Sequence, residues 1–110
     1  MAGVGTEITE YLKEYHMTEA KAIKGRDLCE LFNVKDKQLR NIITVLRQEQ
    51  KPICSSSNGY WYSKAPEDLE KTLHRMEAQV HNMNFSITGL KRILQEVKEN
   101  EKEESGKEKK

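Results

Sequence analysis

The most constraining feature of the sequence is an apolar row in its last third, where hydrophobic residues recur at alternating intervals of four and three. A strict repeat of this kind over about four heptads is typical of a coiled-coil helix. A helix of about 30 residues extends roughly 45 Å, which is longer than a domain of about 60 residues covers. We therefore expect the row to require another surface and to mediate self-association. Its members are Leu69, Leu73, Met76, Val80, Met83, Ile87, Leu90, Leu94 and Val97.

The heptad leaves helix orientation and copy number open. β-branched residues at a positions with leucine at d favour a parallel dimer, but Met76 and Met83 fall at d, where methionine specifies poorly, and the flanking positions pair charges weakly. An alternative is a helix that folds back on the rest of the chain. Asn84, Ser86 and Gly89 are poor helix formers, and a break at 84–89 would give two antiparallel helices, 66–83 and 87–100.

Composition limits the rest of the chain. The 110 residues predict one small domain with an appended element, and 35% hydrophobic residues provide for one small core. A net charge of +1 excludes a protein that binds nucleic acid by bulk charge. We expect no membrane span and no signal peptide. The two cysteines are too few for a disulfide framework, so we expect a reducing, cytoplasmic setting.

Three short helices are expected in the first 50 residues. The first has Thr6 as its N-cap and ends near His16, the second covers 25–32, and the third runs from Asp36 to about Gln50. Asn33 separates the second and third helices as a left-handed residue. Apolar residues of the second helix that we expect to point inward are Leu28, Cys29, Leu31 and Phe32.

A β-hairpin is expected next. Lys51-Pro52 ends the third helix, and β-prone residues 53–56 and 60–63 flank Ser57-Asn58-Gly59, in which Asn-Gly is a hairpin signal. Ile23 is expected to pair as a minimal strand. The domain plan is therefore a compact domain at 1–64, a heptad helix at 65–98 that opens near Pro66, and a disordered charged tail at 99–110.

This order of elements resembles a winged helix-turn-helix domain. Cys29 stands where that motif has a small residue, Asn33 supplies the turn four residues later, and Val34, Leu39 and Ile42 occupy its buried positions. The segments Leu39–Ile43, Leu46-Arg47 and Pro52–Ser55, followed by Gly59-Tyr60, look like the recognition helix and wing of small bacterial and phage regulators, including the biotin-repressor type. The fold class is thus mainly α with a small β-hairpin and a long C-terminal helix.

A polar arc on the third helix is the candidate site. Burying its aliphatic side turns polar residues outward, where Arg reads guanine, Asn reads adenine and Thr contacts either base edge or a thymine methyl. Residues at the helix start would lie near phosphates, and by analogy with the family the hairpin tip would track the adjacent groove, although it carries no Lys or Arg. The predicted DNA-binding residues are Lys35, Lys37, Gln38, Arg40, Asn41, Thr44, Arg47, Gln48, Lys51, Ser57 and Asn58.

We therefore expect a non-enzymatic, double-stranded-DNA-binding regulator that acts as an oligomer. The alternative is a protein-interaction or assembly module that uses the same fold without DNA, since a fold does not settle function. The tyrosines and tryptophan at 60–62 could serve as a base-stacking platform, although such a run more often covers a sheet face.

No metal, cofactor or small-molecule site is expected: His74 and His81 lie about 10 Å apart on a helix, and the cysteines have no CxxC partner.

Overall fold

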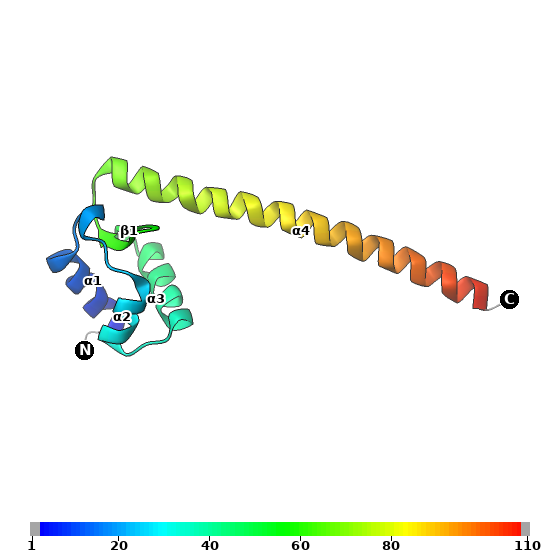
Figure 1. Ribbon diagram of the computed structural model, residues 1–110, viewed down its shortest axis with the longest axis horizontal. Helices are drawn as coiled ribbons and strands as arrows, with labels where there is room; N and C mark the ends of the chain where they lie inside the picture. The colour runs from blue at the N-terminus through cyan, green and yellow to red at the C-terminus, as the bar shows by residue number, and fades with distance from the viewer. Residues whose placement is uncertain (1–2, 109–110) are drawn as a thin grey trace. The chain divides into compact units, whose positions relative to one another are not determined.

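A computed structural model describes residues 3–108, with side chains described as far as residue 102. The chain is mainly helical with one small antiparallel hairpin and a long C-terminal helix, as expected, an arrangement compatible with a winged helix (Figure 1). It forms two compact units, of which the first ends at Arg75 and the second begins at Met76. The elements in order are α1 (Val4–Tyr15), a 3-10 turn η1 (Glu19–Lys21), α2 (Gly25–Phe32), α3 (Asp36–Gln48), β1 (Ile53–Ser56), β2 (Gly59–Tyr62) and α4 (Pro66–Glu108).

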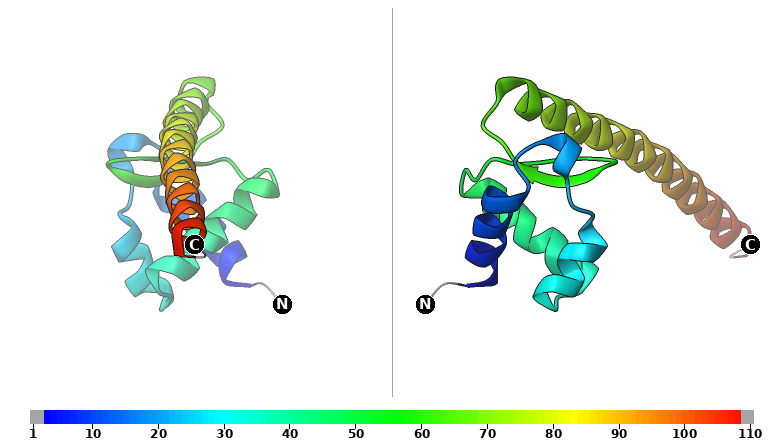
Figure 2. Two further views of the ribbon diagram at one scale, coloured as in Figure 1. Left: turned by 90° about the vertical axis from the view of Figure 1, so that its right-hand side faces the viewer. Right: turned by 60° about the vertical axis from the view of Figure 1, so that its left-hand side comes forward.

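The core of the first unit forms where α1, α2 and α3 pack together on one face of the hairpin (Figure 2). Each helix contributes apolar residues spaced three or four apart, so that one stripe per helix is removed from water. Burial of such side chains stabilises the fold by about 1.5–3 kcal/mol each. The buried cluster consists of Ile8, Leu12, Ile23, Leu28, Leu39, Ile43, Leu46, Ile53 and Tyr62.

The opposite face of the hairpin is also covered. Cys54 and Trp61 are register partners, so they share the face that Ile53 and Tyr62 do not occupy, and both are fully buried. The start of α4 lies against this face, because Ser55 N–H donates to Thr72 Oγ1 at 3.2 Å and Thr72 is only 5% exposed. The first unit therefore extends past the expected boundary at residue 64.

The first helix begins earlier than expected. Gly3, not Thr6, is the N-cap, and Glu7 N–H already donates to Gly3 O at 3.1 Å. Contact with α3 explains the extension: a Cβ at Gly5 would lie 3.3 Å from Leu46 Cδ2, so the first turn of α1 packs directly on α3. This tertiary contact overrides the local capping preference of Thr6.

The second helix has the expected bounds, and Asn33 is left-handed as predicted, with φ 52° and ψ 51°. The prediction for one residue of this helix is wrong, because Leu31 is 57% exposed. At 100° per residue, Leu28, Phe32 and Cys29 span an arc of about 100°, and Leu31 lies about 60° outside that arc, on the side of Leu28 away from Cys29. Leu31 therefore falls beyond the edge of the core that the other three residues contact.

The third helix ends two residues before the expected Gln50. Gln50 has a positive φ of 68°, and Lys51 N–H donates back to Leu46 O at 3.0 Å. This is a Schellman-type C-cap, in which a left-handed residue lets the following N–H groups satisfy the last carbonyls of the helix. The helix therefore ends by capping before Pro52 is reached.

The hairpin is present, but its loop is one residue shorter than the expected Ser57-Asn58-Gly59, and the second strand covers 59–62 instead of 60–63. Ser56 pairs with Gly59, so the loop is Ser57-Asn58 and Gly59 is the first residue of β2. Ile23 bridges to Tyr60, as expected, and this contact explains the glycine: a Cβ at Gly59, where φ is 123°, would collide with the carbonyl oxygen of Ile23. Gly59 is used for the close approach of another segment rather than for the turn.

The last helix, α4, is continuous from Pro66 to Glu108, so the alternative of a break at 84–89 is wrong. It also continues through residues 99–108 of the expected disordered tail, where Glu and Lys are good helix formers; Lys109 and Lys110 lie outside the described residues. None of the helices in residues 3–108 is long and apolar enough to cross a membrane.

Candidate nucleic-acid interface

A polar stripe runs along the exposed face of α3. Lys37, Asn41, Thr44 and Gln48 are all exposed, and their spacing of four, three and four aligns them on one side of the helix. Leu39, Ile43 and Leu46 are buried on the opposite side. The expected division of this helix into an aliphatic inner face and a polar outer face is therefore present.

The first turn of α3 is fixed by its own cap. Gln38 Oε1 accepts a hydrogen bond of 2.8 Å from Lys35 N–H, which satisfies a backbone donor at the N-terminus. Lys35 and Lys37 are exposed beside this turn. Gln38 thus has a structural role in addition to its place on the predicted surface, and the two lysines carry the positive charge there.

Arg40 is exposed but paired. Its guanidinium forms an ion pair with Asp36 one turn earlier, and the two side chains are 72% and 64% exposed. Exposed pairs of this type contribute only about 0.3–0.5 kcal/mol. A phosphate or a guanine edge would therefore compete easily with Asp36 for Arg40. The hydroxyl of Thr44 donates to Arg40 O at 2.9 Å. The oxygen of Thr44 is still available as an acceptor.

Arg47 is held by the protein itself. Its Nε donates to Ile53 O and its Nη2 donates to Ser55 Oγ, both at 2.9 Å. Burial lowers the pKa of the Arg47 guanidinium from its ordinary value. Arg47 therefore joins the end of α3 to β1, and fewer of its donors are free for a phosphate than its position in the sequence suggests.

The hairpin turn is exposed and is held by distant parts of the chain. Lys24 Nζ donates to Ser57 O at 2.6 Å, and Asn58 Nδ2 donates to Glu19 Oε2 at 3.2 Å. Sequence reasoning missed Lys24, which brings a positive charge to a turn that has none of its own. The signal was available, since Lys24 directly follows Ile23, the residue expected to pair with the hairpin.

Glu19 connects the turn to α4. Besides Asn58, it accepts a hydrogen bond of 2.6 Å from Lys71 Nζ. The pKa of the Glu19 carboxyl is lowered by the hydrogen bond from Lys71 first and by one from Ser56 next. Lys51 is exposed between α3 and β1, at the opposite end of α3 from Lys35.

Trp61 and Tyr62 do not provide a stacking platform, and Tyr60 is partly buried against the core. Trp61 is fully buried and Tyr62 is 8% exposed, so neither ring face is available to a base. The alternative that these residues cover the sheet is the one observed. Burial raises the pKa of the thiols of both Cys29 and Cys54, which favours the uncharged form of each.

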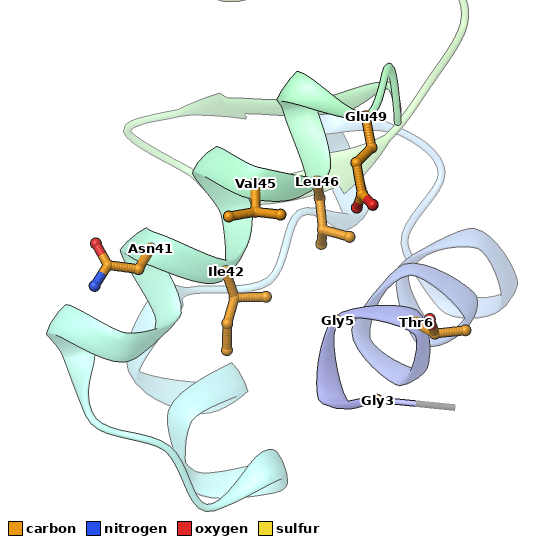
Figure 3. Close-up of a pocket in the computed structure, with 8 residues that line it drawn as sticks. All are labelled: Gly3, Gly5, Thr6, Asn41, Ile42, Val45, Leu46 and Glu49. Atoms are coloured by element: carbon orange, nitrogen blue, oxygen red, sulfur yellow. The ribbon is translucent and has the colours of Figure 1, made fainter. Parts of the chain in front are cut away.

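An apolar groove of about 330 Å³ lies between the start of α1 and α3 (Figure 3). Ile42, Val45 and Leu46 face it, whereas the amide of Asn41 points away from α1. No pattern in the sequence indicates this pocket, because the groove depends on how α1 crosses α3. The groove shares Asn41 with the polar stripe, and the other three stripe residues do not line it.

The apolar row of α4 is exposed from Leu73 onward. Eight of its nine residues are between 38% and 67% exposed, whereas Leu69 is half-buried at the start of the helix. The exposed members are Leu73, Met76, Val80, Met83, Ile87, Leu90, Leu94 and Val97.

Comparison with known proteins does not add to this description. No family model, curated protein or solved structure matches the chain.

Proposed function

We propose that this chain is a winged helix-turn-helix protein that binds duplex DNA as an oligomer, joined through α4, and acts as a small non-catalytic regulator of the transcriptional or phage type in the cytoplasm. The observation that carries the proposal is the exposed stripe Lys37–Asn41–Thr44–Gln48 on α3. This helix follows α2 through the left-handed Asn33 and precedes a hairpin. A recognition helix and a wing stand in this order in the family that the sequence resembles.

The chemistry of the stripe suits base edges in the major groove. Asn41 can bond an adenine in bidentate fashion, Thr44 can accept or donate, and Arg40 can reach a guanine after leaving Asp36. Lys35 and Lys37, beside the N-terminus of α3, suit phosphates, as does Lys51. Lys24 supplies charge at the hairpin turn through its bond to Ser57.

The small number of free cations limits the affinity of one chain. Each phosphate contact contributes to binding through release of a counterion, so a surface with about four lysines gives weak binding and a shallow salt dependence. Two or more linked chains would multiply the contacts. Occupancy of paired sites by an oligomer is therefore the mechanism that we propose.

Fluorescence anisotropy with random-sequence duplex DNA at about 50 and 200 mM salt tests this proposal. We expect salt-sensitive binding that is weakened about tenfold or more by Lys37→Ala combined with Arg40→Ala, and a salt slope reduced by about one for each phosphate that the variant no longer neutralises. The matched control is Lys21→Ala combined with Lys64→Ala, which also removes two exposed positive charges but none from α3. That control should bind nearly as the parent does.

Absence of binding at the lower salt concentration would contradict the proposal, as would an equal loss in the α3 variant and its control. In that case the second candidate, a protein-docking module, gains support. The groove between α1 and α3 favours that candidate, since Val45 is 51% exposed at its edge. An exposed apolar side chain beside a concave apolar surface is typical of a site for another protein.

A further inference from the structure

The apolar row of α4 is exposed to water, and burying it against another surface would provide a favourable free energy. The eight exposed members lie on one side of an uninterrupted helix. A second helix with the same periodicity would cover them by knobs-into-holes packing. The apolar row alone does not determine whether that second helix runs parallel or antiparallel to the first. The charged residues beside the row distinguish the two orientations.

The residues that directly follow the d positions change sign along the helix. Glu70 and Glu77 precede Asn84, and Lys91 and Lys98 follow it, all at intervals of seven and all exposed. In the part of the chain that the structure describes, none of the four charged residues forms an ion pair. This flank of the seam is therefore acidic before Asn84 and basic after it.

An antiparallel partner places this flank against its own reversed copy. Glu70 then faces Lys98 of the second copy, Glu77 faces Lys91, and Asn84 faces Asn84. Every charge on the flank meets an opposite charge, and the two central amides meet across the symmetry axis, where each can donate and accept. In a parallel pair the flank would instead face the residues before the a positions, which are uncharged: Thr72, Gln79, Ser86 and Ile93.

The same register pairs the whole apolar row. Centred near residue 85, it joins Leu73 with Val97, Met76 with Leu94, Val80 with Leu90, and Met83 with Ile87, so each exposed member has one partner. Leu69 is left over, and it is the member that is half-buried at the start of α4. A shift of one heptad leaves Val97 unpaired in one direction and Leu73 with Met76 unpaired in the other, and either shift separates Glu77 from Lys91.

We propose that a second copy of this chain packs antiparallel on α4, with its seam centred near residue 85 and its glutamates on the lysines of the partner. This gives the orientation of the oligomer in the proposed function. The inference does not require DNA binding, because it rests only on α4, and its tests contain no DNA. Failure of one proposal is therefore distinguishable from failure of the other.

Disulfide formation between two single variants of the full chain measures the orientation. In the antiparallel pair Leu73→Cys and Val97→Cys lie in one layer when the variants are mixed, whereas two copies of residue 73 are about 36 Å apart along the helices. We expect a mixed 73–97 disulfide, identified by peptide mass spectrometry, and no 73–73 or 97–97 disulfide. The parent chain, which keeps Cys29 and Cys54, is the control and should give no covalent dimer. Disulfides of 73–73 and 97–97 would overturn the proposal in favour of a parallel pair, and a parent chain that stays monomeric at about 100 µM in light scattering would overturn it entirely.

Charge reversal tests the pairing independently. Glu70→Lys with Glu77→Lys makes the flank basic throughout, and Lys91→Glu with Lys98→Glu makes it acidic throughout. Each variant alone should dimerise about tenfold or more weakly than the parent, because every facing pair then repels. An equimolar mixture should recover association as a heterodimer in analytical ultracentrifugation. Unchanged association of the separate variants would overturn the antiparallel register, because it is the result expected when this flank faces neutral residues.

Discussion

Gly59 and Gly89 differ in whether there is room for a side-chain methyl group at their Cα atoms. A Cβ at Gly59 would collide with the carbonyl oxygen of Ile23, with φ at 123°, whereas nothing lies within 4 Å of the corresponding position at Gly89. The first glycine is therefore required by a close approach of two segments. The second lies in the interior of α4, where glycine is a poor helix former.

We expect Gly59→Ala to destabilise the protein by about 2 kcal/mol or more, because strain and a backbone clash combine. Gly89→Ala should instead stabilise it, or at least α4, by about 0.5–1 kcal/mol. Urea unfolding followed by Trp61 fluorescence measures the first, and far-ultraviolet circular dichroism measures the second. A neutral effect of Gly59→Ala would show that Ile23 does not pack on the hairpin as described.

The Glu19 carboxylate should give stability that depends on pH. Its pKa in the folded state is lowered, first by Lys71, so folding is favoured by this group above the ordinary value of 4.5 and the benefit disappears as the pH falls through the folded-state pKa. We expect Glu19→Gln to lose less stability than the parent between pH 6 and pH 3. Lys71→Gln should have a smaller effect in the same direction, because Ser56 and Asn58 still lower the pKa of Glu19, and the double variant should behave as Glu19→Gln does. Additive effects of the two changes in chemical denaturation would rule out their coupling.

Among the elements, α3 separates residues that hold the fold from residues that face solvent. Arg47→Ala removes two hydrogen bonds to β1 from a partly buried cation, so we expect a loss of about 1.5–3 kcal/mol in the free energy of unfolding. Arg40→Ala removes only an exposed pair and should change stability by about 0.5 kcal/mol or less. Thermal unfolding of the two variants tests the distinction, and equal losses would contradict it.

Periodicity and local signals predicted those elements whose geometry depends on their own residues. The second helix lies between Gly25 and the left-handed Asn33, and its bounds were predicted correctly. The polar face of α3 followed from the spacing of Leu39, Ile43 and Leu46. Features set by distant contacts were not predicted: the start of α1 depends on Leu46, and Gly59, expected in the loop, belongs to β2, where it closely approaches the carbonyl of Ile23.

The same limit applies to the candidate site. Exposure of Lys37, Asn41 and Thr44 follows from helix geometry alone, so the sequence was sufficient. The internal bonds of Arg47 and the position of Lys24 on the turn require the hairpin to be placed against α3 and η1. No local pattern encodes those contacts, because Arg47 bonds across the connection from α3 to β1 and Lys24 bonds to a residue 33 positions away.

At the scale of the whole molecule, the first unit includes the start of α4. Thr72 bonds to Ser55 and Lys71 bonds to Glu19, so a chain that ends at Lys64 lacks part of the cover of its own hairpin. We expect a chain that ends at Arg75 to have a higher melting temperature than one that ends at Lys64. Each kcal/mol by which the longer chain has the larger free energy of unfolding should raise its melting temperature by about 4–8 °C. Equal melting temperatures would place the boundary of the compact unit at residue 64.

The contacts at the hairpin tip have a consequence for recognition. Ser57 and Asn58 form a two-residue loop that Lys24 and Glu19 already hold in place. Conformational freedom of such a loop is lost when the chain folds, and a macromolecule that later meets it does not have to immobilise it. The tip therefore presents its hydroxyl and amide groups as a preformed surface, and association there incurs a smaller entropic penalty than a mobile loop of equal length would impose.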